Sequence, residues 1–146
     1  MNLTQAEYES LANLRYVMRR FLRFSEKEAL RFALTPQHHQ ALLALRGLPE
    51  GRERATVGAL AERLQIRPHS AVGLVDRLVT QGLVERQIHG ADRRQVFVVL
   101  TEAGRDRLEG LSKVHREELY RIGPEIQAIL TQLAEPGASR SAPDVL

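Results

Sequence analysis

The spacing of apolar residues along this chain changes from helical to strand-like and back to helical. Near the N-terminus, apolar residues follow the three- and four-residue steps of one helix face: Leu11, Leu14, Val17, Met18, Phe21 and Leu22. This spacing predicts a long amphipathic helix within residues 4–31. A helix of this length is not stable alone in water, so we expect its apolar face to pack against another element or another subunit.

A second helix is predicted to begin at Thr35-Pro36, because Thr is a good N-cap and Pro is favoured at the first helical position. Its apolar face consists of leucines, namely Leu42, Leu43, Leu45 and Leu48. The Gly- and Pro-containing segment 47–54 is expected to be a loop.

Two further helices are predicted in the middle of the chain, over residues 57–64 and 70–81. Apolar residues recur at helical spacing in both: Val57, Leu60, Ala61 and Leu64, then Ala71, Leu74, Val75 and Leu78. A short break at residues 65–68 separates them. Gly82 ends the second helix, since glycine adopts the left-handed conformation at low cost, and Leu83 can then pack back.

Alternating residues rich in β-branched side chains follow, and they predict a β-hairpin. Val84, Arg86 and Ile88 lead into its tip, and Val96, Val98 and Leu100 lead out. The tip, residues 89–94, contains Gly and Asp, which suit a turn, and two adjacent arginines, which suit phosphate. Two helices joined by a short turn and followed by a basic hairpin make a winged helix-turn-helix, whose second helix enters the major groove of DNA.

The C-terminal third is predicted to be helical with one interruption. Thr101 is an expected N-cap, with Glu102 in the first turn near the positive end of the helix. The helix is expected to run to Ile122, to break at Gly123-Pro124, and to restart over residues 125–134. Residues 135–146 are small, polar and Pro-containing, so we expect a disordered tail.

The sequence resembles the MarR (multiple antibiotic resistance regulator) family. The resemblance is carried by SAVGLVDRL at residues 70–78, GLVER at 82–86, Asp92-Arg93-Arg94, Val98, and LTEAG at 100–104. It implies a mainly α fold with a small β-wing, in which a winged helix-turn-helix domain (35–100) lies between N-terminal (1–34) and C-terminal (101–134) dimerisation helices. The alternative for those helices is an intramolecular bundle in a monomer.

The resemblance also implies a function. It suggests a sequence-specific regulator of transcription, acting as a homodimer on a pseudo-palindromic operator in double-stranded DNA and serving as a ligand-responsive repressor. The alternative is a winged helix that docks protein, or an architectural DNA-binding module without an effector. Val72 and Gly73 make the second helix less polar than is usual in the family, which favours the protein-docking alternative, whereas the Asp-Arg-Arg tip argues against it.

The residues expected to contact DNA lie at the start of the second helix and at the hairpin tip. They are Arg67, Pro68, His69, Ser70 and Arg77, together with His89, Asp92, Arg93 and Arg94. Gly73 has no side chain to read a base, so readout is expected to depend on Arg67, His69, Ser70 and Gln65, or on DNA shape. Arg77 lies one turn beyond Gly73 on the same face, where a phosphate contact and an ion pair with Asp76 or another acidic residue are both open.

At the hairpin tip, the resemblance suggests that Asp92 orients an arginine, that Arg94 enters the minor groove, and that Arg93 meets a backbone phosphate. A narrow minor groove concentrates negative potential, which attracts a guanidinium. His89 is placed in the turn. Arg86, on the first strand, is expected to form a structural ion pair.

Family members bind small aromatic or phenolic ligands between their dimerisation helices and the winged helix. By position, the expected lining is Tyr16, Arg20, Phe24, His38, His39 and Leu42. No catalytic arrangement stands out, so an enzyme is not predicted, and neither is a cofactor. The histidine spacing gives no clear metal site.

Composition narrows the class of protein. The formal net charge is only +3, but residues 67–94 hold five arginines against three acidic residues. There is no cysteine, which excludes disulfides and thiolate metal sites. The N-terminus does not read as a signal peptide and no apolar run is long enough to span a membrane, so a cytoplasmic location is expected.

Overall fold

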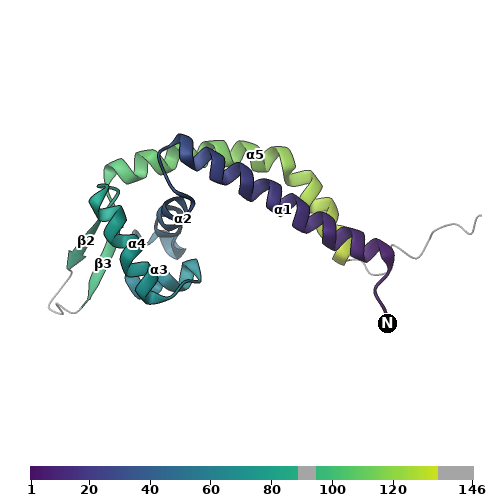
Figure 1. The fold of residues 1–146 in the computed structure, drawn as a ribbon, viewed down its shortest axis with the longest axis horizontal. Helices are drawn as coiled ribbons and strands as arrows, with labels where there is room; N and C mark the ends of the chain where they lie inside the picture. The colour runs from purple at the N-terminus through teal and green to yellow at the C-terminus, as the bar shows by residue number, and fades with distance from the viewer. Residues whose placement is uncertain (89–94, 135–146) are drawn as a thin grey trace, which may run out of the picture. The chain divides into compact units, whose positions relative to one another are not determined.

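A computed structural model describes residues 1–88 and 95–134 of the chain. Its elements, in order, are α1 (Gln5–Arg31), α2 (Pro36–Arg46), a 3-10 turn (Pro49–Gly51), β1 (Arg54–Thr56), α3 (Val57–Leu64), α4 (Pro68–Thr80), β2 (Val84–Ile88), β3 (Val96–Leu100) and α5 (Glu102–Ala134) (Figure 1). The chain divides into two compact units. We call residues 26–113 the winged-helix unit, and residues 1–25 with the described residues from 114 onward the terminal-helix unit.

The winged-helix unit is built around one apolar core to which all of its main elements contribute. Leucines predominate among its fully buried side chains: Leu34, Leu42, Leu45, Leu60, Leu74, Leu78, Leu83 and Leu111. The predicted helical spacing of α3 and α4 is confirmed, because the apolar face of each helix packs into this core. Figure 1 shows α2, α3 and α4 grouped beside the β2–β3 hairpin.

The sheet has three antiparallel strands in the order β1-β3-β2, so the predicted hairpin gains a third strand. Ala55 of β1 pairs with Val98 of β3, and Val84 of β2 pairs with Leu100. These four side chains are buried on the inner face of the sheet. The prediction that residues 47–54 form a loop is therefore only partly correct. Arg54 starts β1, a strand too short to show alternation and stabilised by pairing with the distant β3.

Helix ends follow the predicted capping chemistry. The hydroxyls of Thr35 and Thr101 accept the backbone N–H groups of His38 and Gly104, each at 3.1 Å. Beyond α4, Gly82 has a φ of 73°, and Leu83 N–H donates back to the carbonyl of Leu78 at 3.0 Å. This is the Schellman arrangement, and Leu83 is buried in the core.

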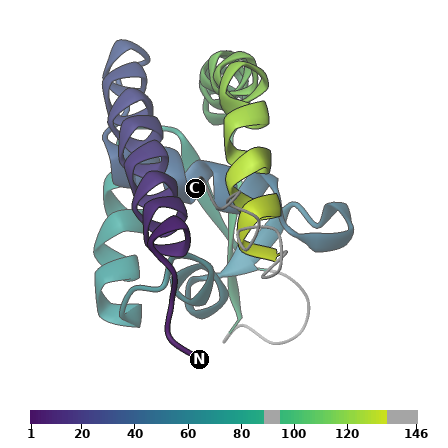
Figure 2. The same ribbon diagram turned by 90° about the vertical axis from the view of Figure 1, so that its right-hand side faces the viewer.

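In the terminal-helix unit, α1 and the second half of α5 run antiparallel (Figure 2). Three contacts fix their register: Ser10 with Gln132 at 3.1 Å, Arg20 with Glu125 at 3.0 Å, and Ser25 with His115 at 2.7 Å. The small core between them consists of Val17, Ile122 and Ile129, with Leu14, Phe21, Ile126 and Leu133 packed around it.

The predicted break at Gly123-Pro124 is wrong, because α5 continues through Pro124 as one helix. A proline inside a helix removes a hydrogen bond and clashes with the carbonyl four residues earlier, at a cost of about 3 kcal/mol. Ile122 and Ile129, which flank Pro124, are 4% and 7% exposed against α1. Burial of two such side chains contributes about 1.5–3 kcal/mol each, which offsets the cost of the proline. The predicted pair of C-terminal helices is therefore one helix.

The apolar residues of α1 do not share one buried face. Val17 is buried within the terminal-helix unit, whereas Leu11, Met18 and Leu22 are 42%, 52% and 53% exposed. Leu43, assigned to the apolar face of α2, is also exposed. Among the described residues, no helix is long and apolar enough to cross a membrane.

Candidate nucleic-acid interface

One face of α4 is buried and the opposite face is open to solvent. Ala71, Leu74, Val75 and Leu78 pack into the core and fix the orientation of the helix. The residues exposed at its start include three of the predicted DNA contacts, Pro68, His69 and Ser70, and Arg67 is exposed just before it. The structure therefore brings Arg67, Pro68, His69 and Ser70 together at the start of α4, the predicted recognition helix, whereas the predicted contact Arg77 lies about two turns further along it.

The N-terminus of α4 lacks the side-chain cap that the structure gives to α2, α3 and α5. Arg67 occupies the N-cap position, and its side chain makes no capping hydrogen bond. The first helical hydrogen bond runs from Ala71 N–H to the carbonyl of Arg67 at 3.1 Å. The N–H groups of His69 and Ser70 therefore precede the hydrogen-bonded part of the helix and point out of its positive end, where an anion is favoured.

Arg77 lies on the outward face one turn beyond Gly73. A Cβ atom at Gly73 would lie 3.5 Å from Nη1 of Arg77, so the guanidinium lies over the position where a side chain at Gly73 would project. The sequence left open an ion pair between Arg77 and Asp76. The structure instead pairs Asp76 with Arg86 of β2. The signal in the sequence is the four-residue spacing of Gly73 and Arg77, which places both residues on one face of the helix.

The Asp76–Arg86 pair links α4 to the first strand of the hairpin. It confirms the prediction that Arg86 forms a structural ion pair. Gln65, considered as a base contact, is instead committed to the end of α3. Its side-chain amide donates to the carbonyl of Glu62 at 2.8 Å and to the Glu62 carboxylate at 2.9 Å.

His38 of α2 is 5% exposed, and its Nδ1 has no hydrogen-bond partner among the described residues. Burial lowers the pKa of His38, and the positive charge of Arg77 lowers it further. Burial and the positive charge of Arg77 on α4 therefore both favour the neutral form of the His38 imidazole.

The predicted contacts at the hairpin tip, His89, Asp92, Arg93 and Arg94, lie outside the described residues. The strands that lead to the tip are described and are paired up to Ile88 and Val96.

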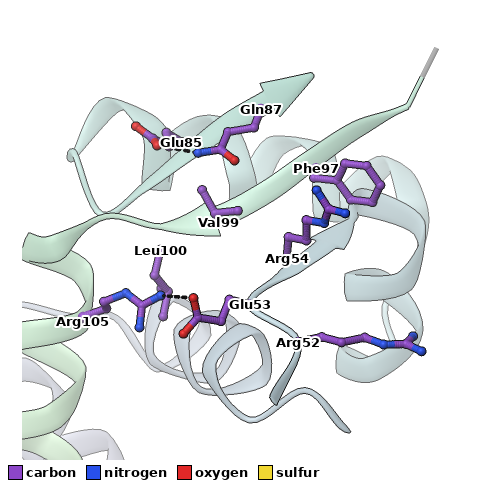
Figure 3. Close-up of a pocket in the computed structure, with 9 residues that line it drawn as sticks. All are labelled: Arg52, Glu53, Arg54, Glu85, Gln87, Phe97, Val99, Leu100 and Arg105. Carbon is purple, nitrogen blue, oxygen red and sulfur yellow. Dashed lines mark hydrogen bonds and ion pairs between the residues drawn. The ribbon is translucent and has the colours of Figure 1, made fainter. Parts of the chain in front are cut away.

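The outer face of the sheet carries an open hollow of about 650 Å³, drawn in Figure 3. Its polar groups are largely matched with one another. Arg105 pairs with Glu53 at 3.0 Å, and Gln87 donates to Glu85 at 2.9 Å. The guanidinium of Arg54 lies 4.7 Å from the centre of the Phe97 ring. The hollow therefore carries both arginine and glutamate side chains, and it presents no surface of one charge.

The predicted effector residues fall in both units. In the terminal-helix unit, Arg20 and Phe24 line a hollow of about 280 Å³, and Tyr16 lies beside it with the Arg20 guanidinium 5.0 Å from its ring centre. Phe24 also meets the ring of His115 edge-on, with 5.9 Å between ring centres.

The remaining predicted effector residues, His38, His39 and Leu42, lie on α2 in the winged-helix unit. All three are buried, and Leu42 is part of the core. Among the described residues, no group of three or more metal-binding side chains occurs.

Comparisons with known proteins identify the family of the central segment. Residues 34–95 match the model of the MarR family. The HTH-type transcriptional repressor YetL of Bacillus subtilis is 33% identical over 89 residues, which cover 53% of each chain. The chain thus spans about half the length of the curated relatives it matches.

Solved structures extend the likeness beyond the central segment. AbsC, a MarR family transcriptional regulator from Streptomyces coelicolor, is 25% identical with a TM-score of 0.68, and the match covers 83% of this chain and 80% of AbsC. A mutant of E. coli MarR, solved with operator DNA, has the same fold at 23% identity, a TM-score of 0.63, and coverage of 73% and 74%. The resemblance seen in the sequence is confirmed: residues 34–95 match the MarR family model, and the chain has the winged-helix fold of solved MarR family regulators.

Proposed function

We propose that this chain is a sequence-specific DNA-binding regulator of transcription. The observation that carries the proposal is the outward face of α4, where the uncapped helix start and the side chains of Arg67, His69 and Ser70 are exposed together. Backbone N–H groups at a helix start bind phosphate, and short polar and cationic side chains beside them can reach base edges. YetL and AbsC, which this chain resembles, are named as a transcriptional repressor and a transcriptional regulator.

The hairpin tip supplies the second contact of the proposed interface. Asp92 orients an arginine, Arg93 meets a phosphate, and Arg94 enters the minor groove. The pair between Asp76 and Arg86 supports this arrangement, because it ties the strand leading to the tip to the recognition helix. His89 completes the turn.

We further propose that the protein binds as a homodimer through its terminal helices. α5 presents a stripe of apolar and small residues along a shallow hollow: Leu119, Gly123, Ile126, Leu130 and Ala134. Leu119 and Leu130 are 44% and 50% exposed, and α1 adds exposed leucines and a methionine. Exposed apolar stripes of this kind are usual at subunit interfaces, and two-fold dimers are the commonest homo-oligomers. The matching operator is a pseudo-palindrome with half-sites about one helical turn apart.

The protein is proposed to act as a repressor that responds to a small aromatic or phenolic effector. The name of YetL as a repressor supports the first part. The hollow beside Tyr16, lined by Arg20 and Phe24, supports the second, since it offers aromatic rings to a planar ligand next to the Arg20 guanidinium, which is paired with Glu125. An effector would act by binding more tightly to a form of the dimer that does not fit the operator.

Fluorescence anisotropy with a duplex from upstream of the gene, compared with a scrambled duplex over a salt series, tests the DNA-binding proposal. We expect tight binding to the first duplex only, falling steeply with salt as phosphate contacts release counterions. Equal binding to both duplexes would indicate an architectural role. Absence of binding to either duplex, or to any duplex selected from a random library, would contradict the proposal. It would instead favour a protein-docking surface, for which the 44% exposure of Val72 on α4 is the supporting observation.

A further inference from the structure

On the outward face of α4, the guanidinium of Arg77 lies in the space that the missing side chain of Gly73 leaves open. The Arg77 guanidinium lies over Gly73, with its Nη1 3.5 Å from the position that a Cβ atom would take there. Side chains on a helix lean towards its N-terminus, so a long residue lies over the residue four positions earlier. Because Gly73 has no side chain, the guanidinium occupies the middle of the face.

The guanidinium of Arg77 forms no ion pair with the described residues of the protein. The adjacent carboxylate of Asp76 pairs with Arg86, and no carboxylate among the described residues lies within ion-pair distance of Arg77. Five other arginines of the described residues are paired with carboxylates, namely Arg20, Arg31, Arg52, Arg105 and Arg121, whereas Arg63 and Arg67, which flank the turn before α4, resemble Arg77 in having no ion pair among the described residues. The hydrogen-bond donors of Arg77 are therefore free to meet a ligand.

The residues around Arg77 on this face do not compete with it. Val72 is exposed and apolar, and Gly73 has no side chain. The uncapped start of α4 lies two turns away and offers the backbone donors that suit phosphate. The centre of the face thus carries one planar donor group, while the phosphate-binding features lie at its end.

We infer that Arg77 reads the edge of a guanine in the major groove and that Gly73 determines this specificity by leaving the guanidinium room above the helix. The inference rests on the proposed DNA-binding function and deepens it. An arginine donates two parallel hydrogen bonds to O6 and N7 of guanine, a pattern that no other base presents. The base readout that a side chain at Gly73 cannot give is thereby supplied by the residue one turn later.

The test uses the full chain and duplexes enriched from a random library by the wild-type protein. Each base pair of the enriched duplex is then replaced in turn, and the affinity of each duplex is measured for wild type and variants. Arg77→Lys keeps the charge but loses the planar pair of donors. We expect it to lose preference at one guanine in each half-site by about 5- to 100-fold, with little change in binding to scrambled duplex.

Two substitutions of Gly73 form a matched pair. In Gly73→Ala, the added methyl group lies at ordinary contact distance from Arg77, so we expect the guanine preference to be kept. Gly73→Leu adds branched bulk where the guanidinium lies, so we expect the same loss as in Arg77→Lys. Since Arg77 lowers the pKa of the nearby His38, an NMR titration of that imidazole checks the displacement without DNA. It should show a higher pKa in Gly73→Leu and little change in Gly73→Ala.

The outcomes separate this inference from the proposal beneath it. If the library yields no preferred duplex for the wild-type protein, the proposed function fails and the inference fails with it. If the wild type selects a duplex but Arg77→Lys keeps the full preference at every base pair, only the inference is overturned, and Arg77 is then a phosphate contact. Equal behaviour of Gly73→Ala and Gly73→Leu, with both folded by thermal unfolding, would also overturn it.

Discussion

A Cβ atom at Gly104 would lie 2.1 Å from the carbonyl oxygen of Leu83, far inside the contact distance of two atoms. Neither backbone can move away easily. Leu83 closes the end of α4 through its N–H, and its carbonyl accepts the N–H of Thr101 at 3.1 Å. Gly104 donates its own N–H to the hydroxyl of Thr101, which caps α5. The end of the recognition helix and the start of α5 are therefore held together at a point where only glycine fits.

We predict that Gly104→Ala lowers the free energy of unfolding by about 2–3 kcal/mol, the range of a clash in a well-packed site. Gly58→Ala is the matched control, because Gly58 also lies in the first turn of a Thr-capped helix and has no close neighbour. There the substitution should stabilise by about 0.5–1 kcal/mol through the better helix propensity of alanine. Urea unfolding of both variants checks this. A fall in stability in Gly58→Ala equal to that in Gly104→Ala would contradict the role assigned to Leu83.

The pair between Asp76 and Arg86 should contribute little to stability. Their side chains are 61% and 35% exposed, and exposed ion pairs typically contribute about 0.2–1 kcal/mol. A double-mutant cycle with Asp76→Ala and Arg86→Ala should give a coupling energy in that range. The pair of Glu50 and Arg52, whose side chains are 78% and 70% exposed, serves as the control and should give less. A coupling energy well above about 1 kcal/mol would contradict the prediction, because it would mean that the pair stabilises the fold more than exposed ion pairs do.

Acid should destabilise the protein in part through His38. Burial and the charge of Arg77 lower the pKa of this histidine in the folded state below its unfolded value of about 6.5. The unfolded chain therefore binds the proton more readily, so stability falls as pH drops from about 6.5 towards the folded pKa. We predict that unfolding free energy decreases more between pH about 7.5 and 5.5 in wild type than in His38→Leu. Denaturant unfolding of both proteins at the two pH values, at one protein concentration, measures these decreases. An equal decrease in wild type and His38→Leu would contradict the prediction.

Local chemistry in the sequence was sufficient to predict most helix boundaries of the winged-helix unit. Thr35 and Thr101 carry their capping groups within a few residues of the helices they cap, and Gly82 is needed wherever a helix ends in the left-handed conformation. Because these capping signals lie within a few residues of the helix ends, they can be recognised in the sequence without knowledge of the rest of the fold. The exposed start of α4 followed from the same local pattern.

Features that depend on distant parts of the chain were not predictable. β1 forms because Ala55 finds Val98 across the sheet, and α5 continues through Pro124 because residues on both sides pack against α1. In each case tertiary packing overrides a local preference that the sequence shows clearly.

The proposed dimer makes a prediction about the apolar stripe on α5. Leu130→Arg places a charge in the middle of the hollow that includes Leu119 and Ile126, so we expect the protein to shift towards monomer. Ala128→Arg adds the same charge at an exposed position of α5 that does not line the hollow. It should leave the oligomeric state unchanged. Sedimentation velocity over a concentration series measures both variants. An unchanged dimer in Leu130→Arg would place the interface elsewhere.

The hairpin tip gives the last prediction, which follows from the sequence and the proposed function. Arg94→Ala should weaken binding to every duplex, because a minor-groove arginine responds mainly to the negative potential of the groove. If the arginine also neutralises a phosphate, the slope of log affinity against log salt should become shallower by about one.

Arg31→Ala is a suitable control for this prediction, since it removes the same charge from a residue of α1 whose side chain is 75% exposed and paired with Glu28. The two variants have equal net charge, so a difference between them reports contact with DNA rather than general attraction. If Arg94→Ala binds as tightly as Arg31→Ala at physiological salt, the tip does not enter the minor groove. The interface would then be confined to α4, where Arg67, His69 and Ser70 would have to supply the whole salt dependence.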